Sequence, residues 1–209
     1  MKNYEDWDWT KYTAVYMRQM AEVYRDKLFD ILIDPTKISH NADGVIEFGD
    51  SNLHPNHAEI YHLVDKFQPK SVLEVGVGCG YLIKNISVIL PEADIHGIDI
   101  SEGQLGLCTW FPQLPERILN NLRLMDISQT TPDRTFDFVY TQAVLMHMTT
   151  ARATQALHNM KKISNKYVFM VEAPNAHPNW EDIIKSVFSD WEFSKPRRFL
   201  QDGILVTKK

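Results

Sequence analysis

The stretch Ser71-Val72-Leu73-Glu74-Val75-Gly76-Val77-Gly78-Cys79-Gly80 decides how this chain folds. Its apolar first half, residues 71–75, predicts a buried strand, and residues 81–90 predict the helix that follows. The glycines between them let the backbone turn tightly and approach a ligand closely, because a side chain there would occupy the ligand's space. A strand, a glycine-rich turn and a helix in this order predict a ligand-binding edge of an α/β sheet.

The spacing of the glycines separates two classes of nucleotide cofactor. A dinucleotide fingerprint reads G-x-G-x-x-G/A and would place Gly or Ala at position 81. This chain has Tyr81 there, and its third glycine is Gly80 instead. Glu74 stands two positions before the first glycine. The resulting E-x-G-x-G-x-G pattern resembles the first motif of the class I S-adenosylmethionine-dependent methyltransferases.

Two further predicted strands end in acidic residues that fit this resemblance. Residues 93–98 are rich in apolar side chains and are followed by Asp99. In the family, the carboxylate that closes the second strand binds both ribose hydroxyls, since it can accept two hydrogen bonds. Residues 121–125 predict a third strand ending in Asp126. There the family uses a carboxylate to accept a hydrogen bond from the adenine amino group, with apolar neighbours around the ring.

A fourth predicted strand, residues 135–140, leads into Thr141-Gln142-Ala143-Val144-Leu145-Met146-His147. This segment looks like that of small-molecule methyltransferases, whose loop borders both the methionine moiety and the acceptor. All four motifs lie at carboxyl ends of strands, the edge at which open α/β sheets bind ligands. The resemblance covers roughly residues 57–172 and implies S-adenosylmethionine as cofactor. The cofactor-binding residues that it implies are Glu74, Gly76, Gly78, Gly80, Asp99, Ile100, Asp126, Ile127 and Gln142.

Strands alternate with helices along the sequence, which implies parallel β-α-β units and an α/β fold. The length of 209 residues predicts a single domain over residues 1–209. The resemblance implies a Rossmann-like, doubly wound sheet of seven strands in the order 3-2-1-4-5-7-6, with the last strand antiparallel. We expect residues 56–209 to form the cofactor-binding core and residues 1–55 to form an N-terminal helical extension.

The N-terminal extension is longer than the core fold needs. Residues 12–33 predict a helix that ends at Asp34-Pro35. Two interpretations of its aromatic residues stay open: they form a lid over the acceptor pocket, or they only attach an added helix to the core. These aromatic residues are Trp7, Trp9, Tyr12, Tyr16 and Tyr24.

Composition excludes several other classes of protein. Hydrophobic content of 44% and charged content of 23% are ordinary for a globular protein. A net charge of −5 argues against a broad phosphate-binding surface, so duplex nucleic acid is not the expected partner. No apolar run is long enough for a membrane span, and Met1–Thr10 is too polar for a signal peptide. Cys79 and Cys108 show no paired spacing, which favours a reducing, cytoplasmic location.

His147 is the candidate catalytic base. Methyl transfer is an in-line displacement, so the protein must hold the nucleophile near the methyl group and keep its lone pair free. An alcohol or phenol needs a base or a metal for this, whereas an amine need only be deprotonated. His147 follows the fourth strand, and histidine titrates near neutral pH. The alternative is that His147 only packs beside the loop.

Other polar groups are weaker candidates. Glu172 and His177 follow the fifth strand and could bind acceptor hydroxyls or a divalent ion, but a metal site needs several converging ligands and none is expected here. His54 and His57 are more typical of a helix entry than of a ligand pair. A small basic group near the last strands would more often be a solvated surface than an anion site; it consists of Lys195, Arg197 and Arg198.

These patterns favour a methyltransferase that O-methylates a small or mid-sized polar acceptor, such as a sugar, a glycan precursor or a secondary metabolite. An N-methyltransferase and a protein or RNA methyltransferase stay open as alternatives. The Asn-Pro-Pro-aromatic signature of many amino-methyltransferases is missing, since Thr141-Gln142-Ala143-Val144 stands at that place. A nicotinamide-dependent oxidoreductase fits the motifs less well because of Tyr81, and a non-catalytic subunit fits less well because the cofactor motifs are intact.

Overall fold

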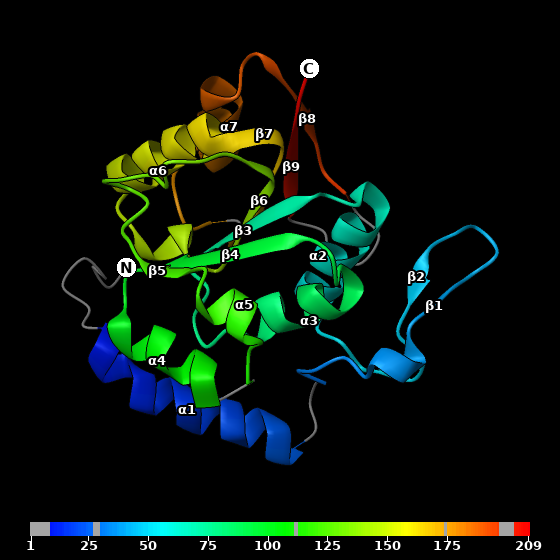
Figure 1. The fold of residues 1–209 in the computed structure, drawn as a ribbon. Coiled ribbons are helices and arrows are strands. Elements are labelled where there is room, and N and C mark those ends of the chain that lie inside the picture. Colours follow the sequence, from blue (N-terminus) through cyan, green and yellow to red (C-terminus); the bar gives the residue numbers. More distant parts are fainter. Residues whose placement is uncertain (1–8, 27–29, 111–112, 174, 197–202) are drawn as a thin grey trace.

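A seven-stranded sheet forms the centre of the molecule in the computed structural model, which describes residues 9–26, 30–110, 113–173, 175–196 and 203–209 (Figure 1). Neighbouring strands follow the order β5-β4-β3-β6-β7-β9-β8. Counted along the chain from β3, this is the predicted order 3-2-1-4-5-7-6. The last strand is antiparallel to both neighbours, and the remaining pairs from β5 to β7 are parallel, so the predicted fold is confirmed. The strands are β3 (Ser71–Val75), β4 (Asp94–Asp99), β5 (Leu122–Leu124), β6 (Phe136–Gln142), β7 (Ser164–Val171), β8 (Trp191–Ser194) and β9 (Ile204–Lys208).

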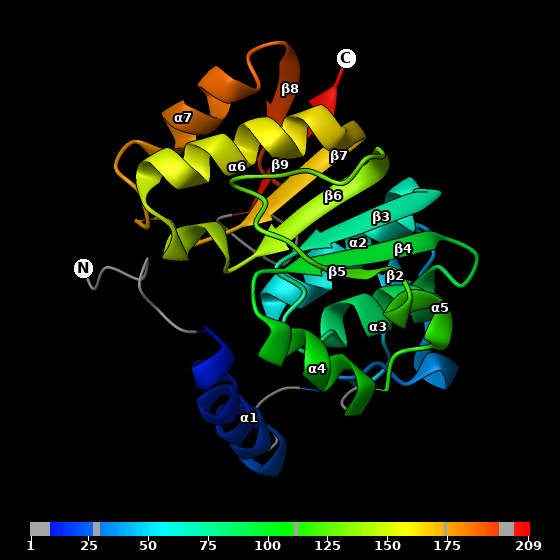
Figure 2. The ribbon, with the colours of Figure 1, turned by 60° about the vertical axis from the view of Figure 1, so that its left-hand side comes forward.

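Helices cover both faces of this sheet (Figure 2). One face carries α2 (Pro55–Phe67), α3 (Tyr81–Ile89), α4 (Glu102–Trp110) and α5 (Glu116–Leu119), and the other carries α6 (Thr150–Ile163) and α7 (Trp180–Val187).

Each face has its own apolar core, because side chains of a strand alternate between the two faces. Phe138 of β6 belongs to the core that contains Ile83 of α3. Val139, the next residue, belongs to the core that contains Leu157 of α6. Phe138 and Val139 are both fully buried. A strand buried on both faces explains why the segment around them reads as a nearly continuous apolar run.

The N-terminal helix α1 (Trp9–Asp26) ends earlier than the apolar pattern over residues 12–33 predicts. Residues 30–34 are not helical, and residues 27–29 lie outside the described residues. Asn85 of α3 explains the difference: its amide donates to the Ile31 carbonyl (2.7 Å) and accepts from the Ile33 N–H (3.0 Å). Ile31 and Ile33 are therefore buried as an extended segment on the core rather than as part of a helix.

The rest of the extension consists of small elements. A 3-10 turn, η1 (Pro35–Lys37), is followed by the antiparallel pair β1 (Ser39–His40) and β2 (Ile46–Glu47). Helix α1 itself lies beside α4 (Figure 1).

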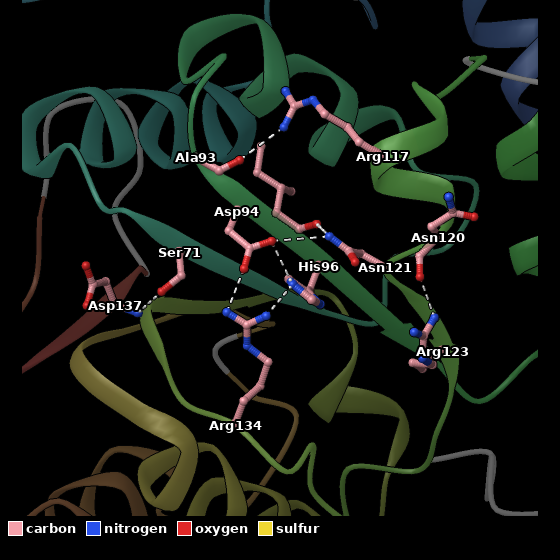
Figure 3. A network of polar contacts seen from close by, with 11 residues as sticks. Ser71, Ala93, Asp94, His96, Arg117, Asn120, Asn121, Arg123, Arg134 and Asp137 are labelled. Atoms are coloured by element: carbon pink, nitrogen blue, oxygen red, sulfur yellow. Dashed lines mark hydrogen bonds and ion pairs between the residues drawn. The ribbon is translucent and has the colours of Figure 1, made fainter.

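The amino ends of the strands are closed by a polar network (Figure 3). Asp94, at the start of β4, accepts from Arg134 (2.6 Å) and from the Asn121 amide (3.3 Å), and it lies 2.9 Å from the His96 ring nitrogen. The Arg134 guanidinium also covers the Phe136 ring, 5.1 Å from its centroid. These contacts tie β4, the start of β5 and the start of β6 together, at the end of the sheet opposite the glycine turn.

Cys79 and Cys108 are both buried and both free thiols. No helix in the described ranges has the length and apolar character that crossing a membrane requires. The cytoplasmic location expected from the sequence stays a prediction.

Candidate active site

The glycine turn between β3 and α3 depends on backbone conformations that other residues rarely adopt. Gly76, Gly78 and Gly80 all have positive φ, at 79°, 55° and 84°. A Cβ on Gly76 would lie 2.1 Å from a methyl group of Val144, in the segment after β6. The turn and this segment are therefore in direct contact, and only glycine fits between them.

A cavity of about 560 Å³ opens beside this turn, within the usual size range of small-molecule sites. Its walls come from the glycine turn and the start of α3, from the end of β4 and α4, from the segment after β6, and from helix α1. It lies where the strand order reverses on either side of β3, the position at which open α/β sheets bind ligands. The predicted site residues that line it are Glu74, Gly76, Gly78, Asp99, Ile100, Gln142 and His147.

Asp99 is held in a fixed orientation at the end of β4. One carboxylate oxygen accepts from the Gly78 N–H (2.9 Å) and the other from the Ser101 N–H (2.8 Å). Burial raises the pKa of this carboxyl above its ordinary value. Each oxygen keeps further acceptor capacity toward the cavity. The adjacent Ile100 is 52% exposed, so an apolar surface lies beside the carboxylate.

Two of the buried oxygen atoms that accept no hydrogen bond of ordinary geometry among the described residues lie near the turn: Oε1 of Gln104, and Oε2 of Glu74, whose carboxyl has the Tyr140 hydroxyl as a neighbour. Both side chains line the cavity. Burial raises the pKa of Glu74 well above its ordinary value, and the negative charge of Asp99 adds to this effect. Buried acceptors without a donor are costly, so a ligand that presents N–H groups here would be stabilised.

Asp126 and Ile127 follow β5, at the end of the third strand of the core as expected, but neither is among the residues that line the cavity. The Asp126 carboxylate forms an ion pair with Arg152 (2.6 Å) and accepts from the Ser128 N–H (2.9 Å) and the Gln129 amide (2.9 Å). Ile127 is 2% exposed and belongs to the core under α6. Arg152 of α6 lines the cavity instead.

Gly80 is also outside the lining of the cavity. It is the N-cap residue of α3, where its positive φ and the 3.0 Å approach that a Cβ would make to Cys108 Sγ require glycine. Gly80 therefore determines the conformation of the turn without lining the cavity.

His147 lies at the end of the 3-10 turn η2 (Leu145–His147) and lines the cavity. Its ring meets the edge of the Trp9 ring, with centroids 4.9 Å apart. Burial lowers the pKa of His147, which favours the neutral imidazole that a base requires. Trp9 comes from α1, and Tyr12 and Gln19 of the same helix also face the cavity. The extension thus forms part of the wall on the His147 side.

The side chains of Glu172 and His177 both contact the segment after β6. The Glu172 carboxylate accepts from the N–H groups of Val144 and Met146, and His177 Nε2 lies 2.9 Å from the Leu145 carbonyl. No group of three or more side chains in the described part of the chain is arranged to hold a metal ion.

The remaining candidates have other roles. His54 is the N-cap of α2, because its ring nitrogen accepts from the Asn56 N–H (3.2 Å), as expected for a helix entry. His57 lies 3.2 Å from the Tyr81 hydroxyl, and burial lowers the pKa of His57 to about 3. Lys195 forms an ion pair with Glu181. Arg197 and Arg198 lie outside the described residues.

Fold and cavity together describe an α/β protein with a cavity at the carboxyl ends of its parallel strands. The family model of a methyltransferase domain matches residues 72–166. No curated protein sequence matches the chain.

Solved structures of methyltransferases share the fold. Magnesium protoporphyrin IX methyltransferase from Synechocystis PCC 6803 with bound S-adenosylmethionine is 16% identical, with a TM-score of 0.61 over 75% of this chain and 79% of that chain. The N-methyltransferase NodS from Bradyrhizobium japonicum WM9 with S-adenosylhomocysteine is 16% identical, with a TM-score of 0.54 over 73% and 84%. The plantazolicin methyltransferase BpumL with a monoazolic desmethylPZN analog and S-adenosylhomocysteine is 15% identical, with a TM-score of 0.57 over 75% of this chain and 82% of that chain.

The predicted methyltransferase and its S-adenosylmethionine cofactor are thereby confirmed at the level of the domain family.

Proposed function

We propose that the cavity binds S-adenosylmethionine and that the enzyme O-methylates a small or mid-sized polar acceptor, such as a sugar, a glycan precursor or a secondary metabolite. The main support is Asp99, whose two oxygens are oriented by Gly78 and Ser101 and face the cavity. A carboxylate fixed in this way can accept from both ribose hydroxyls. The exposed Ile100 beside it offers an apolar surface to a base.

The methionine part of the cofactor fits the acceptors near the glycine turn. The buried oxygens of Glu74 and Gln104 can accept from an ammonium group. Asp126 is a less direct contact than the sequence suggests, because Arg152 already pairs with its carboxylate. We propose that Asp126 acts near the adenine only through Arg152, which reaches the cavity.

The acceptor would occupy the part of the cavity between the segment after β6 and α1. Bound S-adenosylmethionine supplies an electrophilic methyl group, so the chain's own task is to orient the acceptor and remove its proton. His147 can take that proton as a neutral imidazole, with its ring held against Trp9. A cavity of this volume, walled by α1, favours a small acceptor over a protein or RNA.

Calorimetric titration with S-adenosylmethionine, S-adenosylhomocysteine and NAD tests the cofactor assignment. We expect micromolar binding of the first two ligands and much weaker binding of NAD, because Tyr81 replaces the small residue of a dinucleotide turn. A clear preference for NAD would contradict the proposal. Methylation assays with panels of hydroxyl and amine acceptors then distinguish O-methylation from the N-methyltransferase alternative.

A further inference from the structure

Glu172, directly after β7, is a buried carboxylate beneath the segment that follows β6. It is 7% exposed. One oxygen accepts from the Val144 N–H (3.0 Å) and the Met146 N–H (3.0 Å), and the other lies 3.3 Å from the Thr141 hydroxyl. A single side chain therefore holds the backbone of this segment at two places.

The segment that Glu172 holds is a wall of the cavity. Gln142, Ala143, Val144, His147 and Met148 all line it. Ala143 has a positive φ of 55°, an uncommon conformation for a residue with a side chain, and it lies beside the hydrogen-bonded N–H groups. The hydrogen bonds to Glu172 therefore help to hold this wall, together with the bond from the Ala143 N–H to the Val171 carbonyl and the contact of His177 with the Leu145 carbonyl.

Every hydrogen bond to the Glu172 carboxylate comes from a neutral group, and no ion pair involves it among the described residues. Burial raises the pKa of Glu172 to about 7, against the opposing effect of these bonds. The titratable and charged groups on the surrounding elements are His147 on η2, His177 after β7 and Arg152 on α6. His147 contacts the Trp9 ring and the Ala143 backbone, His177 contacts the Leu145 carbonyl, and Arg152 pairs with Asp126.

We propose that Glu172 is a positioning residue whose ionisation tightens the wall after β6 and so strengthens cofactor binding as the pH rises through neutrality. Hydrogen bonds to an ionised acceptor are roughly twice as strong as those to a neutral one. The ionised carboxylate therefore holds Val144 against Gly76 more firmly than the protonated form does. This inference rests on the proposed function, because it requires the cofactor to occupy this cavity.

The test is the pH dependence of S-adenosylhomocysteine binding, measured by calorimetry between pH 5.5 and 8.5. We expect the affinity of the wild-type protein to rise about three- to tenfold through a single ionisation near pH 7. Glu172→Gln keeps the shape and an acceptor oxygen but cannot ionise. Its affinity should stay at the low-pH level of the wild type throughout. Glu181→Gln, an exposed glutamate of α7, is the matched control and should keep the wild-type profile.

Proton release on S-adenosylhomocysteine binding is a second measure of the coupling between Glu172 ionisation and binding. Binding at pH 7 in buffers of different ionisation enthalpy should release more protons from the wild type than from Glu172→Gln, in which only cavity groups such as Glu74 and Asp99 can still titrate. In the wild type alone, hydrogen exchange at the Val144 and Met146 amides, corrected for intrinsic rates, should be slower at pH 8 than at pH 6. This measurement decides the matter even if the Gln variant does not fold.

The outcomes separate two kinds of failure. If S-adenosylhomocysteine binds at no pH, the proposed function is wrong. The proposed role of Glu172 is then wrong as well, because it requires cofactor binding. If it binds, but the pH dependence is absent or survives in Glu172→Gln, only the role of Glu172 is overturned. Equal corrected exchange at both pH values would overturn it as well.

Discussion

Asp99 shows how one side chain can serve the backbone and a ligand at once. Its oxygens order the glycine turn through Gly78 and the start of α4 through Ser101, and the same oxygens face the cavity. Replacing the charge while keeping the shape should therefore affect ligand binding more than folding.

For Asp99→Asn we expect the affinity for S-adenosylhomocysteine to fall by tenfold or more, since hydrogen bonds to a charged group contribute roughly 1.5–3 kcal/mol each. The apo protein should still unfold in one cooperative transition. Calorimetric titration and thermal unfolding measure the two quantities. Unchanged affinity in the folded variant would show that Asp99 does not contact the cofactor.

His147→Ala tests the base. Cofactor affinity should stay nearly intact, while turnover on an oxygen acceptor should fall by roughly 10²–10⁴-fold. The wild-type rate should rise with pH through an ionisation below the ordinary histidine value, because burial lowers the pKa of His147. A chelator should have no effect on the rate.

His158→Ala, an exposed histidine of α6, serves as the control for this variant. Near-normal turnover of His147→Ala would instead assign His147 a packing role against Trp9. Loss of activity with a chelator, restored by magnesium, would point to a metal that the described residues do not explain.

At the scale of elements, the segment after β6 is held by the segment after β7. Glu172 is buried without a counter-charge, and the raised pKa means that its ionised form costs folding free energy. The same charge strengthens the hydrogen bonds to the loop. The cost of the buried charge lowers the free energy of unfolding, whereas the stronger hydrogen bonds order the segment after β6. The two effects can therefore be measured separately.

The stability of the wild type should fall relative to Glu172→Gln as the pH rises. A carboxyl with a folded pKa of about 7 and an ordinary value of 4.5 contributes its stability below pH 4.5 and loses it as the pH rises to 7. At 1.36 kcal/mol per pKa unit the loss is roughly 3 kcal/mol. Thermal unfolding of both proteins at pH 5, 6, 7 and 8 measures it, and a constant difference in Tm would contradict the buried titration.

The sequence predicts those parts of the fold that depend on patterns among neighbouring residues. The strand at residues 71–75, the glycine turn and the acidic end of β4 are read from neighbouring residues, and the structure has β3 over those residues. The roles of Glu172 and Arg152 are not written locally, because their partners lie 26 to 31 residues away along the chain. Periodicity likewise overextends α1, since the tertiary contacts of Asn85 hold Ile31 and Ile33 in an extended segment.

At the scale of the whole molecule, the two ends of the sheet differ in character. The amino ends are filled by the ion pairs and hydrogen bonds around Asp94 and Arg134 (Figure 3). The carboxyl ends leave a cavity that α1 completes. The amino-terminal edge of the sheet is therefore filled by side chains that stabilise the fold. The carboxyl-terminal edge borders a cavity, and helix α1 of the N-terminal extension forms one of its walls.

Trp9→Ala tests whether α1 acts as a wall of the acceptor site or only packs on the core. We expect KM for the acceptor to rise about three- to tenfold with a smaller change in cofactor affinity, because an aromatic contact is worth about 0.5–1.5 kcal/mol beyond its buried area. Val15→Ala, at an exposed position of the same helix, is the control. If both variants behave as the wild type in steady-state kinetics while the Tm falls, α1 is only a structural addition.

The contact between Trp9 and His147 also gives the protein a built-in optical reporter. A protonated imidazole quenches indole emission, and the two rings lie with centroids 4.9 Å apart. Because the chain has five tryptophans, and the His177 ring centroid also lies 4.6 Å from that of Trp180, the part of the emission that follows His147 is the difference between the wild type and Trp9→Phe. A molecule that entered between α1 and η2 would separate the Trp9 and His147 rings, so acceptor candidates could be screened by this difference signal before any product is detected.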